Sequence, residues 1–522
     1  MTNTKNNLVQ ILTTQGITLE NVQTTPQVMW AEITSAHWHL IATIAQQLHY
    51  RLAAIWAQQL SQHFKVTVVL ATENQYLLLS TWLNEKKPEL ESYAHLYPAA
   101  NRWERHIHDL YGIVFLNHPD SRRWTRHQAW SDQEFPLRRD YNTKSSATLT
   151  PPDATYAFIN ITGNVYEIPV GPVHAGIIEP GHFRFHADGE NVIKLEERLG
   201  YVHKGIEKIA EQRTVNDLLR LAARVSGDST VAHTLAACHA CEEAVALEVP
   251  RRARSLRAIM LERERIANHL GDMGALCNDV GFAFGYYQFG RLRELWQRLN
   301  HQIFGHRFLM DQIIFGGVVT DLSEAAIESI HQQIRGFQRE LKALYPIIEH
   351  NDSLQDRLVT TGILKPETAQ LIGALGYVGK ASHHNFDVRK NLPSFPYEEL
   401  YIAVPNYTAG DVAARFKVRA AETLTSLHLI NEFLKSLPPG KIALKSLPSL
   451  AQKEGFGYVE GWRGETLAYV RFDEKERVAR YFPRDPSWLN WPALEHLIHG
   501  NIVPDFPLCN KSVNGSYSGH DL

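Results

Sequence analysis

The spacing of hydrophobic and polar positions changes character near residue 150, and this change divides the chain into two parts. In the first part, "KVTVVLAT" and "QYLLLSTWL" carry the Val, Thr and Leu content that is typical of β-strands. The preceding stretch, "SAHWHLIATIAQQLHYRLAAIWAQQL", has the apolar spacing of one long helix. The first part is therefore predicted to be an α+β unit.

Beyond this point the helical period dominates. In "TDLSEAAIESIHQQIRGFQRELKALYPIIEH", Asp321 is placed as an N-cap and Glu324 follows three residues later, which predicts a capping box. Apolar residues then recur every three or four positions and form a stripe that should face a core. The stripe consists of Ile327, Ile330, Ile334, Phe337, Leu341 and Leu344.

A second long amphipathic run, "VPRRARSLRAIMLERERIANHLGDMGAL", begins after Pro250, a residue suited to a helix start. Several helices of this length predict a bundle. Short β segments are expected at its edges ("NVYEIPVGPVH", "HFRFHADGENVIKL" and "LAYVRFDEKERVARYF"). The predicted fold class is α+β, with an N-terminal α+β domain followed by a mainly α-helical bundle that carries small β elements.

The stretch "NTKSSATLTPPDATY" (142–156) separates the two parts. It is rich in Ser, Thr and Pro and has no apolar periodicity, which is typical of an interdomain linker. A chain of 522 residues is expected to form two or three domains. We predict domains at 1–145 and 157–522, joined by a linker at 146–156.

Composition and charge narrow the class of protein. A hydrophobic fraction of 44% and a charged fraction of 21% are those of a folded soluble protein. The net charge of −3 gives no electrostatic case for nucleic-acid binding. The start "MTNTKNNLVQ" has no signal pattern, and no apolar run approaches the ~20 residues of a spanning helix. We expect a cytoplasmic chain that can still sit on a membrane through partner subunits.

The four cysteines do not form a disulfide framework in so long a chain. Only Cys238 and Cys241 have metal-like spacing, and a structural zinc site normally needs a second pair, which Cys277 and Cys509 do not supply. The pair falls on a helical pattern, so we expect buried helix residues, because free Cys packs as a small hydrophobe. No metal site is predicted from the cysteines.

The stretch "LLRLAARVSGDSTVAH" (218–233) interrupts a helix-prone run with Ser-Gly-Asp-Ser. A kink or loop between two helices is the simplest interpretation, since Gly and Ser punctuate helices. The small-Gly-x-small spacing after Arg224 admits another interpretation, which depends on longer stretches of the chain.

Those stretches resemble known families. "ERHIHDLYGIVFLNHPDSRRW" with "FPLRRDY" resembles the signature of the C-type subunit of complex I, the bacterial NADH:quinone oxidoreductase. "GPVHAGIIEPGHFRF", "LGYVHKGIEKIAEQR", "GDVAARFKVRAAET" and "EGWRGE" resemble the D-type subunit of complex I and the large subunit of group 4 membrane-bound [NiFe]-hydrogenases, of the hydrogenase-4 and formate-hydrogenlyase type. The resemblance covers nearly the whole chain, and it implies a complex I C-type domain fused to a domain like the hydrogenase large subunit.

The hydrogenase family binds nickel and iron through an early R-x-C-G-x-C and a late D-P-C-x-x-C. The resemblance places "RVSGDS" at the early motif, where Arg224 and Gly227 remain but Ser226 and Ser229 stand at the cysteine positions. At the late motif, Ser516 and Gly519 stand there. Nickel and iron in such sites need soft thiolate ligands. We therefore expect no metal site, and the break at 226–229 is interpreted as a metal-binding loop without its ligands. The resemblance also gives no indication of a maturation tail beyond the late motif.

Two carboxylates persist in this region. The resemblance matches Glu179 to the family's proton-relay glutamate and Glu207 to the glutamate beside the metal centre. A buried carboxylate has a raised pKa and can exchange protons near neutrality. The alternatives are a solvated or ion-paired Glu207 and a turn residue at Glu179, which precedes Pro-Gly.

The resemblance also indicates groups that could bind a quinone or face a cluster. Complex I uses the former metal cavity as a quinone site, with a histidine from the "GPxH" segment and a tyrosine near the early motif. Here His174 and His182 are present, Arg224 is a further candidate, and Gly227 stands at the tyrosine position. In "KASHHNFDVRKN", Asp387 and Arg389 could line the cavity; the alternative is a salt-bridged loop.

Two functions remain open. In the first, the chain is an electron-transfer subunit of a complex I-like or hydrogenase-4-like oxidoreductase, of the NADH:quinone oxidoreductase or hydrogenase type but not an active [NiFe]-hydrogenase by itself. It would cover the iron–sulfur cluster of a small partner that is similar to the B-type subunit of complex I, and it would form a quinone- or proton-handling cavity. In the second, it is a silent scaffold that couples the small subunit to membrane ion-translocating subunits.

The resemblance implies further partners: a ferredoxin-like subunit and antiporter-like membrane subunits, on the cytoplasmic side of the inner membrane with the chain peripheral. The chain itself should carry no cluster, because its four cysteines are scattered. Four retained ionisable groups (Glu179, Glu207, Asp387 and Arg389) favour the first function.

Overall fold

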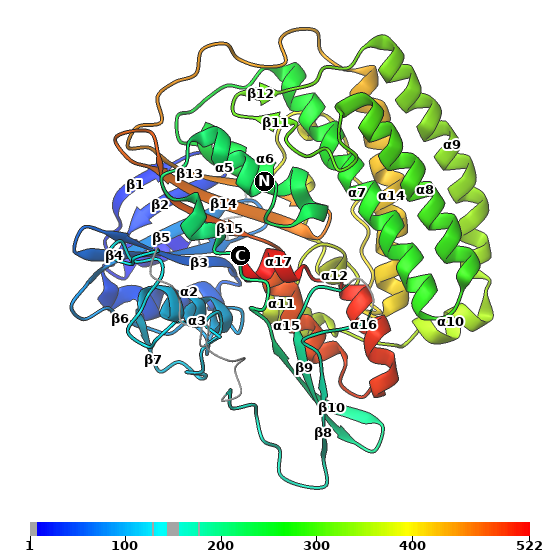
Figure 1. The fold of residues 1–522 in the computed structure, drawn as a ribbon. Helices are drawn as coiled ribbons and strands as arrows, with labels where there is room; N and C mark the ends of the chain where they lie inside the picture. Colours follow the sequence, from blue (N-terminus) through cyan, green and yellow to red (C-terminus); the bar gives the residue numbers. More distant parts are fainter. Residues whose placement is uncertain (1–7, 128–129, 144–155, 176–177) are drawn as a thin grey trace.

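The computed structural model describes residues 8–127, 130–143, 156–175 and 178–522 (Figure 1). Apart from Tyr156, the predicted linker at 146–156 lies outside the described residues, so the boundaries at 145 and 157 stay predictions. The described chain combines helices and strands in the predicted α+β arrangement.

The N-terminal part is a five-stranded sheet with helices packed on it. The strand order is β1-β2-β5-β4-β3; β2 and β5 are parallel and the other neighbours are antiparallel. The elements are α1 (Leu8–Thr14), β1 (Glu20–Thr24), β2 (Val28–Glu32), α2 (Trp38–Gln47), β3 (Arg51–Leu60), β4 (His63–Ala71), β5 (Tyr76–Asn84), β6 (Glu89–Glu91), α3 (Ala100–Tyr111) and β7 (Val114–Leu116). Both predicted strands are confirmed as β4 and β5.

The long helix predicted before these strands is wrong in its second half. Helix α2 ends at Gln47, His49 takes a positive φ of 61°, and the chain continues as β3. Eight successive residues of β3 are buried, so the strand shows no alternation of apolar and polar positions. Its outer face is covered by the second domain, where Trp56 packs against Tyr469 and Phe482 with ring centroids 4.9 and 5.4 Å apart.

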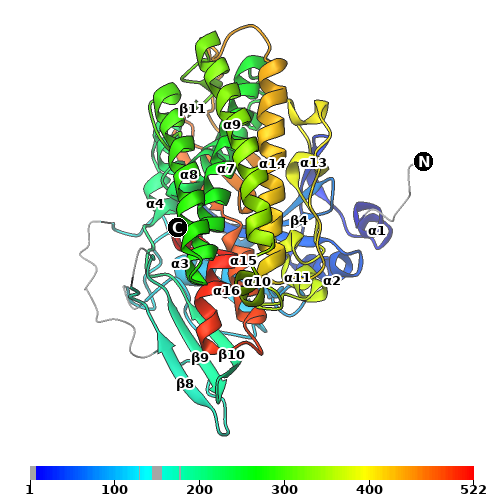
Figure 2. The ribbon, with the colours of Figure 1, turned by 90° about the vertical axis from the view of Figure 1, so that its right-hand side faces the viewer.

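The second part is built on a helical bundle. Helices α7 (Arg251–Asp279), α8 (Ala283–Phe304), α9 (Glu324–Glu349) and α14 (Val412–Lys435) lie side by side (Figures 1 and 2). Pro250 is the N-cap of α7, as predicted, and the predicted stripe of α9 is buried except for a half-exposed Ile327. The predicted cap is wrong by two residues: the Ser323 hydroxyl accepts from the Ala326 N–H, while Asp321 pairs with Arg252.

Two small sheets flank the bundle. One has the order β13-β14-β15 and packs on α6, where Gly455 and Gly457 allow close approach: a Cβ on either would lie 2.1 Å from a carbonyl oxygen of α6. The other has the order β10-β9-β8 and extends from the lower end of the molecule (Figure 2). The predicted β segments at the edges of the bundle are thus confirmed.

The remaining elements complete the second part. They are β8 (Tyr166–Val170), β9 (His182–Asp188), β10 (Asn191–Arg198), α4 (Ile206–Ala210), α5 (Val215–Ala222), α6 (Thr230–Glu243), β11 (Ile313–Ile314), β12 (Gly317–Val318), α10 (Asp352–Leu358), α11 (Pro366–Ile372), α12 (Gly376–Lys380), α13 (Val388–Asn391), β13 (Glu454–Gly461), β14 (Gly464–Phe472), β15 (Val478–Arg484), α15 (Ser487–Leu497), α16 (Phe506–Val513) and α17 (Tyr517–Asp521). Cys238 and Cys241 are buried in α6, as predicted. Among the described helices, none is long and apolar enough to cross a membrane.

Candidate functional site

The loop at the early motif (226–229, the early loop) and the loop at the late motif (514–519, the late loop) meet in space, although 290 residues separate Ser226 from Ser516. Helix α5 ends before the early loop, Ser226 is extended, and a single 3₁₀ turn (Gly227–Ser229) leads into α6. The late loop follows α16 after Asn514, which takes a left-handed conformation with φ 41°. The hydroxyl oxygens of Ser226 and Ser516 lie 2.8 Å apart and form a hydrogen bond.

Ser229 and Gly519, the other two positions that the resemblance matches to metal ligands, are also engaged by neighbouring groups. The Trp462 indole N–H donates to the Ser229 hydroxyl at 3.0 Å. Ser516 is the N-cap of α17, and its hydroxyl accepts from the Gly519 N–H at 2.9 Å. A Cβ on Gly519 would lie 2.6 Å from Cγ of Asp485, so the Asp485 carboxylate occupies the space of a side chain at this position.

An ion pair joins the early loop to the β13–β14 hairpin. Asp228 accepts two hydrogen bonds from the Arg463 guanidinium, at 2.8 and 2.7 Å, and one from the Ser226 hydroxyl at 2.7 Å. Burial opposes the charge of Asp228, but Arg463 outweighs it and the pKa of this carboxyl is lowered. The pair therefore holds the loop in a charged, hydrogen-bonded state.

Asp485 is a further buried carboxylate of this site, beside Gly519 and His233. It is buried, lies 2.8 Å from Nε2 of His233 and accepts from the Ser487 N–H at 2.8 Å. Burial raises its pKa, but His233 and Arg463 outweigh this effect and the pKa stays well below its usual range. Asp485 is thus a second fixed negative charge beside Gly519 and Ser516.

These residues do not fit a nickel–iron centre. The two hydroxyls at the centre are hydrogen-bonded to each other, and neutral hydroxyls are hard, weak ligands for nickel. Gly519 offers no ligand, and a carboxylate fills its side-chain space. Across the described ranges, no group of three or more His, Cys, Asp or Glu side chains is arranged to hold a metal ion.

A cavity of about 630 Å³ opens beside the serines. Its walls come from the segment after β8, the early loop, the end of α7, α16 and the late loop. They include His174, Glu179, Ser226, Gly227, Asp228, Asp279, Arg463, Phe506, Asn510, Lys511, Asn514, Ser516, Tyr517 and Ser518. The cavity therefore has polar and ionisable groups on several sides.

Two predicted candidates, Glu179 and His174, lie in this cavity. Glu179 is exposed and accepts from the Ser518 N–H at 3.1 Å; His174 is half-buried, with Nε2 2.8 Å from the Gly181 carbonyl. Asp279 is a third ionisable group in the cavity. Burial raises its pKa to about 6, with Lys511 opposing. A carboxyl with a raised pKa thus lines the cavity, and it belongs to Asp279, which was not among the predicted candidates.

Glu207 does not line the cavity, so its predicted place there is wrong. Its carboxylate is buried between the two domains, 2.7 Å from Nε2 of His106 on α3 and ion-paired with Arg480 on β15. The predicted raised pKa is also wrong. Burial raises it, but Arg480 and His106 outweigh burial and lower the pKa of Glu207 to about 2. The ion-pair alternative describes this residue, which connects the domains.

Asp387 and Arg389 also lie outside this cavity. They form a fully buried ionic cluster, in which Asp387 pairs with Lys380 at 2.6 Å and with Arg389 at 2.7 Å. Lys380 also contacts Glu422 at 2.7 Å and Glu460 at 3.2 Å. The salt-bridged alternative is therefore what the structure shows, because opposite charges satisfy one another in the interior.

The two remaining candidates point elsewhere. Arg224 is exposed and pairs with Asp311 at 2.5 Å. Lys204 donates to the carbonyls of Arg224 and Val225, immediately before the early loop. His182 is buried, its Nδ1 lies 3.2 Å from the Gly171 carbonyl, and its ring packs on Phe158. Neither side chain reaches the cavity wall.

The sequence interpretation missed Asp228, Arg463, Asp485 and Asp279. Asp228 and Arg463 stand inside two of the quoted motifs, "RVSGDS" and "EGWRGE", so a search for a compensating charge pair between them could have found both. Asp485 and Asp279 carry no local signal, because their roles depend on contacts that only the folded chain creates.

Comparison with known proteins now adds to this geometry. Residues 31–147 match the family described as respiratory-chain NADH dehydrogenase, 30 Kd subunit, and residues 279–454 match the 49 Kd subunit. Residues 204–273, which contain the early loop, match nickel-dependent hydrogenase. The class of protein is thus a hydrogenase-like oxidoreductase subunit with complex I 30 kDa- and 49 kDa-type domains in one chain.

Individual relatives agree with this class. Formate hydrogenlyase subunit 5 of Escherichia coli (strain K12) is 34% identical over 84% of this chain and 78% of its own length. The C/D subunit of NADH-quinone oxidoreductase from Phocaeicola vulgatus is 32% identical over 74% of this chain and 78% of its own length. The chain belongs to the family of these fused complex I- and group 4 hydrogenase-type subunits.

A solved structure shows the same fold in a third setting. A chain of the membrane-bound sulfane sulfur reductase, an archaeal respiratory membrane complex, aligns with a TM-score of 0.65 at 27% identity. The match covers 70% of this chain and all of that one. The relatives are therefore subunits of membrane-bound respiratory or hydrogenase complexes whose named substrates differ.

Proposed function

We propose that the chain is the substrate-site subunit of a membrane-associated oxidoreductase complex, and that the cavity beside Ser226 and Ser516 binds a quinone head group and exchanges protons with it. One observation carries this proposal: ionisable groups surround an open cavity beside Ser226 and Ser516. A structural remnant has no need of Asp279, a carboxyl whose pKa of about 6 lies near the working pH of a proton carrier.

The reaction that we propose for the cavity is the oxidation of a quinol. Oxidation of a quinol to a quinone releases two electrons and two protons. The protons would pass to Asp279 and to His174 or Glu179, which border the same space. The electrons would leave one at a time to an iron–sulfur cluster of a small partner protein that docks on this chain. The Asp228–Arg463 pair would position the head group by hydrogen bonding, since the Asp228 side chain is about one-third exposed.

The assembly we propose follows the relatives. The partners would be an iron–sulfur protein similar to the B-type subunit of complex I, a ferredoxin-like subunit and antiporter-like membrane subunits, with this chain peripheral on the cytoplasmic side of the inner membrane. Any NADH would bind elsewhere in the complex.

The decisive experiment is an EPR redox titration of the natively purified complex, with a water-soluble quinol as the only reductant and metal analysis of the same sample. We expect quinol to reduce a cluster of the small subunit, and Asp279→Asn and Glu179→Gln to slow that reduction at least about tenfold each. Glu328→Gln, on the exposed face of α9, is the control and should behave as the wild type.

A second function, the silent scaffold, is favoured by a different observation. The former ligand positions are closed by hydrogen bonds, and three of the four retained ionisable groups (Glu207, Asp387 and Arg389) serve buried ion pairs. A cluster that is present but indifferent to quinol, in a sample without nickel, would replace the redox proposal with this one. Stoichiometric nickel would overturn both.

A further inference from the structure

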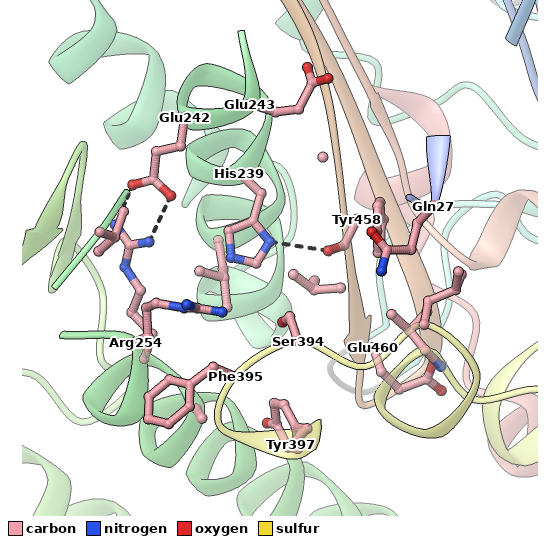
Figure 3. A pocket seen from close by; sticks show the side chains of 18 of the residues that line it. Gln27, His239, Glu242, Glu243, Arg254, Ser394, Phe395, Tyr397, Tyr458 and Glu460 are labelled. Carbon is pink, nitrogen blue, oxygen red and sulfur yellow. Dashed lines mark hydrogen bonds and ion pairs between the residues drawn. The ribbon is translucent and has the colours of Figure 1, made fainter. Parts of the chain in front are cut away.

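A second cavity, of about 530 Å³, lies between the two domains and apart from the former ligand positions (Figure 3). Its walls come from the β1–β2 turn, the end of α6, the first turns of α7, the segment 388–397 and strand β13. This volume is within the range of small-molecule sites.

The first two turns of α7 carry four arginines, and three of them are neutralised. Arg251 pairs with Glu399 at 2.5 Å, Arg252 with Asp321 at 2.7 Å and Arg257 with Glu242 at 2.7 Å. For Arg254, the fourth, no residue in the described ranges supplies an ion pair or a hydrogen bond to the guanidinium. Half-buried, this group lines the cavity.

The position of Arg254 makes its charge available to a ligand. The guanidinium carbon lies 5.1 Å from the centroid of the Phe395 ring, and Figure 3 shows the side chain reaching from α7 into the space near His239 and Ser394. Burial, together with Arg251 and Arg257, lowers the pKa of Arg254, and Glu398 opposes this only in part. An anion in the cavity would supply the missing counter-charge.

The remaining wall restricts the kind of anion. Phe395 and Tyr458 offer ring surfaces, and Gln27 and Ser394 offer neutral polar groups. Four carboxylates also line the cavity: Glu242, Glu243, Glu248 and Glu460. Glu242 is paired with Arg257 and Glu460 with Lys380. Glu243 and Glu248 would repel a multiply charged phosphate, while a single carboxylate held on the Arg254 side avoids most of this repulsion. A flat apolar body fits against the rings.

We propose that this cavity binds a small organic monocarboxylate with a planar apolar body, whose carboxylate accepts hydrogen bonds from the Arg254 guanidinium and whose body packs on Phe395. The site is separate from the quinone cavity, and the proposal does not depend on the function given to that cavity.

The test uses benzoate as the probe, with the complete purified complex, and saturation-transfer NMR as the measurement. Benzoate should bind saturably. Benzamide, which has the same shape without the charge, should bind about tenfold more weakly or worse, because a hydrogen bond to an ionised group is lost. Inorganic phosphate at the same concentration should not displace benzoate.

Two arginine variants distinguish a specific loss of benzoate binding at Arg254 from the effects of removing a positive charge or of unfolding the protein. Arg254→Gln should lose benzoate binding by about tenfold or more and keep the thermal stability of the wild type, because it breaks no ion pair. Arg252→Gln removes the same charge two residues away, outside the cavity wall, and should bind benzoate as the wild type does. Absent benzoate binding, equal binding of benzamide, or unchanged binding by Arg254→Gln would each overturn the proposal.

Discussion

The hydroxyl oxygens of Ser226 and Ser516 lie 2.8 Å apart, at two positions that the sequence resemblance matches to metal-binding cysteines. The hydrogen bond joins the early and late loops directly. Asp228 and Arg463 extend this connection with an ion pair. Polar contacts therefore hold these two loops together.

This geometry makes the pair a candidate for a disulfide. In a Ser226→Cys/Ser516→Cys double variant, we expect the two thiols to oxidise to a disulfide, since side-chain atoms already 2.8 Å apart need only a small shift to reach bonding distance. Alkylation followed by mass spectrometry, with and without reductant, would detect it. Ser229→Cys/Ser516→Cys, for which no such contact exists between the hydroxyls, is the matched control. Two free thiols in the first variant after oxidation would contradict the loop placement.

Glu207 should act on stability rather than on the chemistry of the cavity. Glu207→Gln leaves buried Arg480 without its partner, so the free energy of unfolding should fall by about 3–5 kcal/mol. Urea unfolding at pH 7 would measure this loss. Glu328→Gln, which removes an exposed charge from α9, should leave the urea midpoint unchanged.

The same residue predicts the sign of an acid dependence. Folding lowers the pKa of Glu207 from 4.5 to about 2, so its stabilising effect is complete above pH 4.5 and is lost as the pH falls from 4.5 towards 2. Glu207→Gln should therefore narrow its stability gap to the wild type over this window. A variant that is as stable as the wild type at pH 7 but fails in quinol-dependent reduction would place Glu207 in the functional site instead.

The pH dependence of stability that arises from Asp279 should have the opposite sign to that from Glu207. Folding raises its pKa from 3.8 to about 6, so the folded state binds the proton more tightly and its contribution to stability falls as the pH rises from 3.8 to 6. Asp279→Asn should remove this decline. Melting temperatures of the two proteins between pH 4 and 7 would test it, with a widening advantage of the variant as the expected result. Parallel curves would show that Asp279 does not titrate in this range.

The sequence predicted those elements well whose residue spacing alone indicates a helix or a strand. It predicted poorly those elements that are buried by parts of the chain distant in sequence. The stripe of α9 and the strands β4 and β5 were recognisable from residue spacing alone. Strand β3 was not, because both of its faces are covered and its apolar run has no strand period. The pattern between Arg51 and Leu60 was consistent with either element, and only the packing of the second domain on Trp56 decides it.

For the site, the resemblance located the loops but not the charges. Ser226, Ser229, Ser516 and Gly519 were identified from motif positions, and the structure brings them together. The partner of Glu207 was beyond such reasoning: His106 lies 101 residues earlier and in the other domain. Whether a carboxylate titrates or forms an ion pair depends on partners of this kind, so the proton-handling role that we propose is assigned to Asp279 and not to Glu207.

Lys380 is the central cation of the buried ionic cluster around Asp387, and its replacement should strongly destabilise the protein. It contacts the carboxylates of Asp387, Glu422 and Glu460 within 3.2 Å, and its side chain is fully buried. Lys380→Met would leave these acidic groups facing one another in the interior, so we expect a loss of about 3–5 kcal/mol or more and little soluble protein.

Expression yield and urea unfolding would measure this loss, with Lys435→Met as the control, because Lys435 pairs with Glu432 at the surface. Replacement of Glu460 by Gln in the Lys380→Met background should recover part of the stability. The reason is that burial and Asp387 raise the pKa of Glu460, so the negative charge of this carboxyl is disfavoured in the cluster. A Lys380→Met protein that unfolds like the wild type would show that the cluster is neutralised by proton uptake rather than by Lys380.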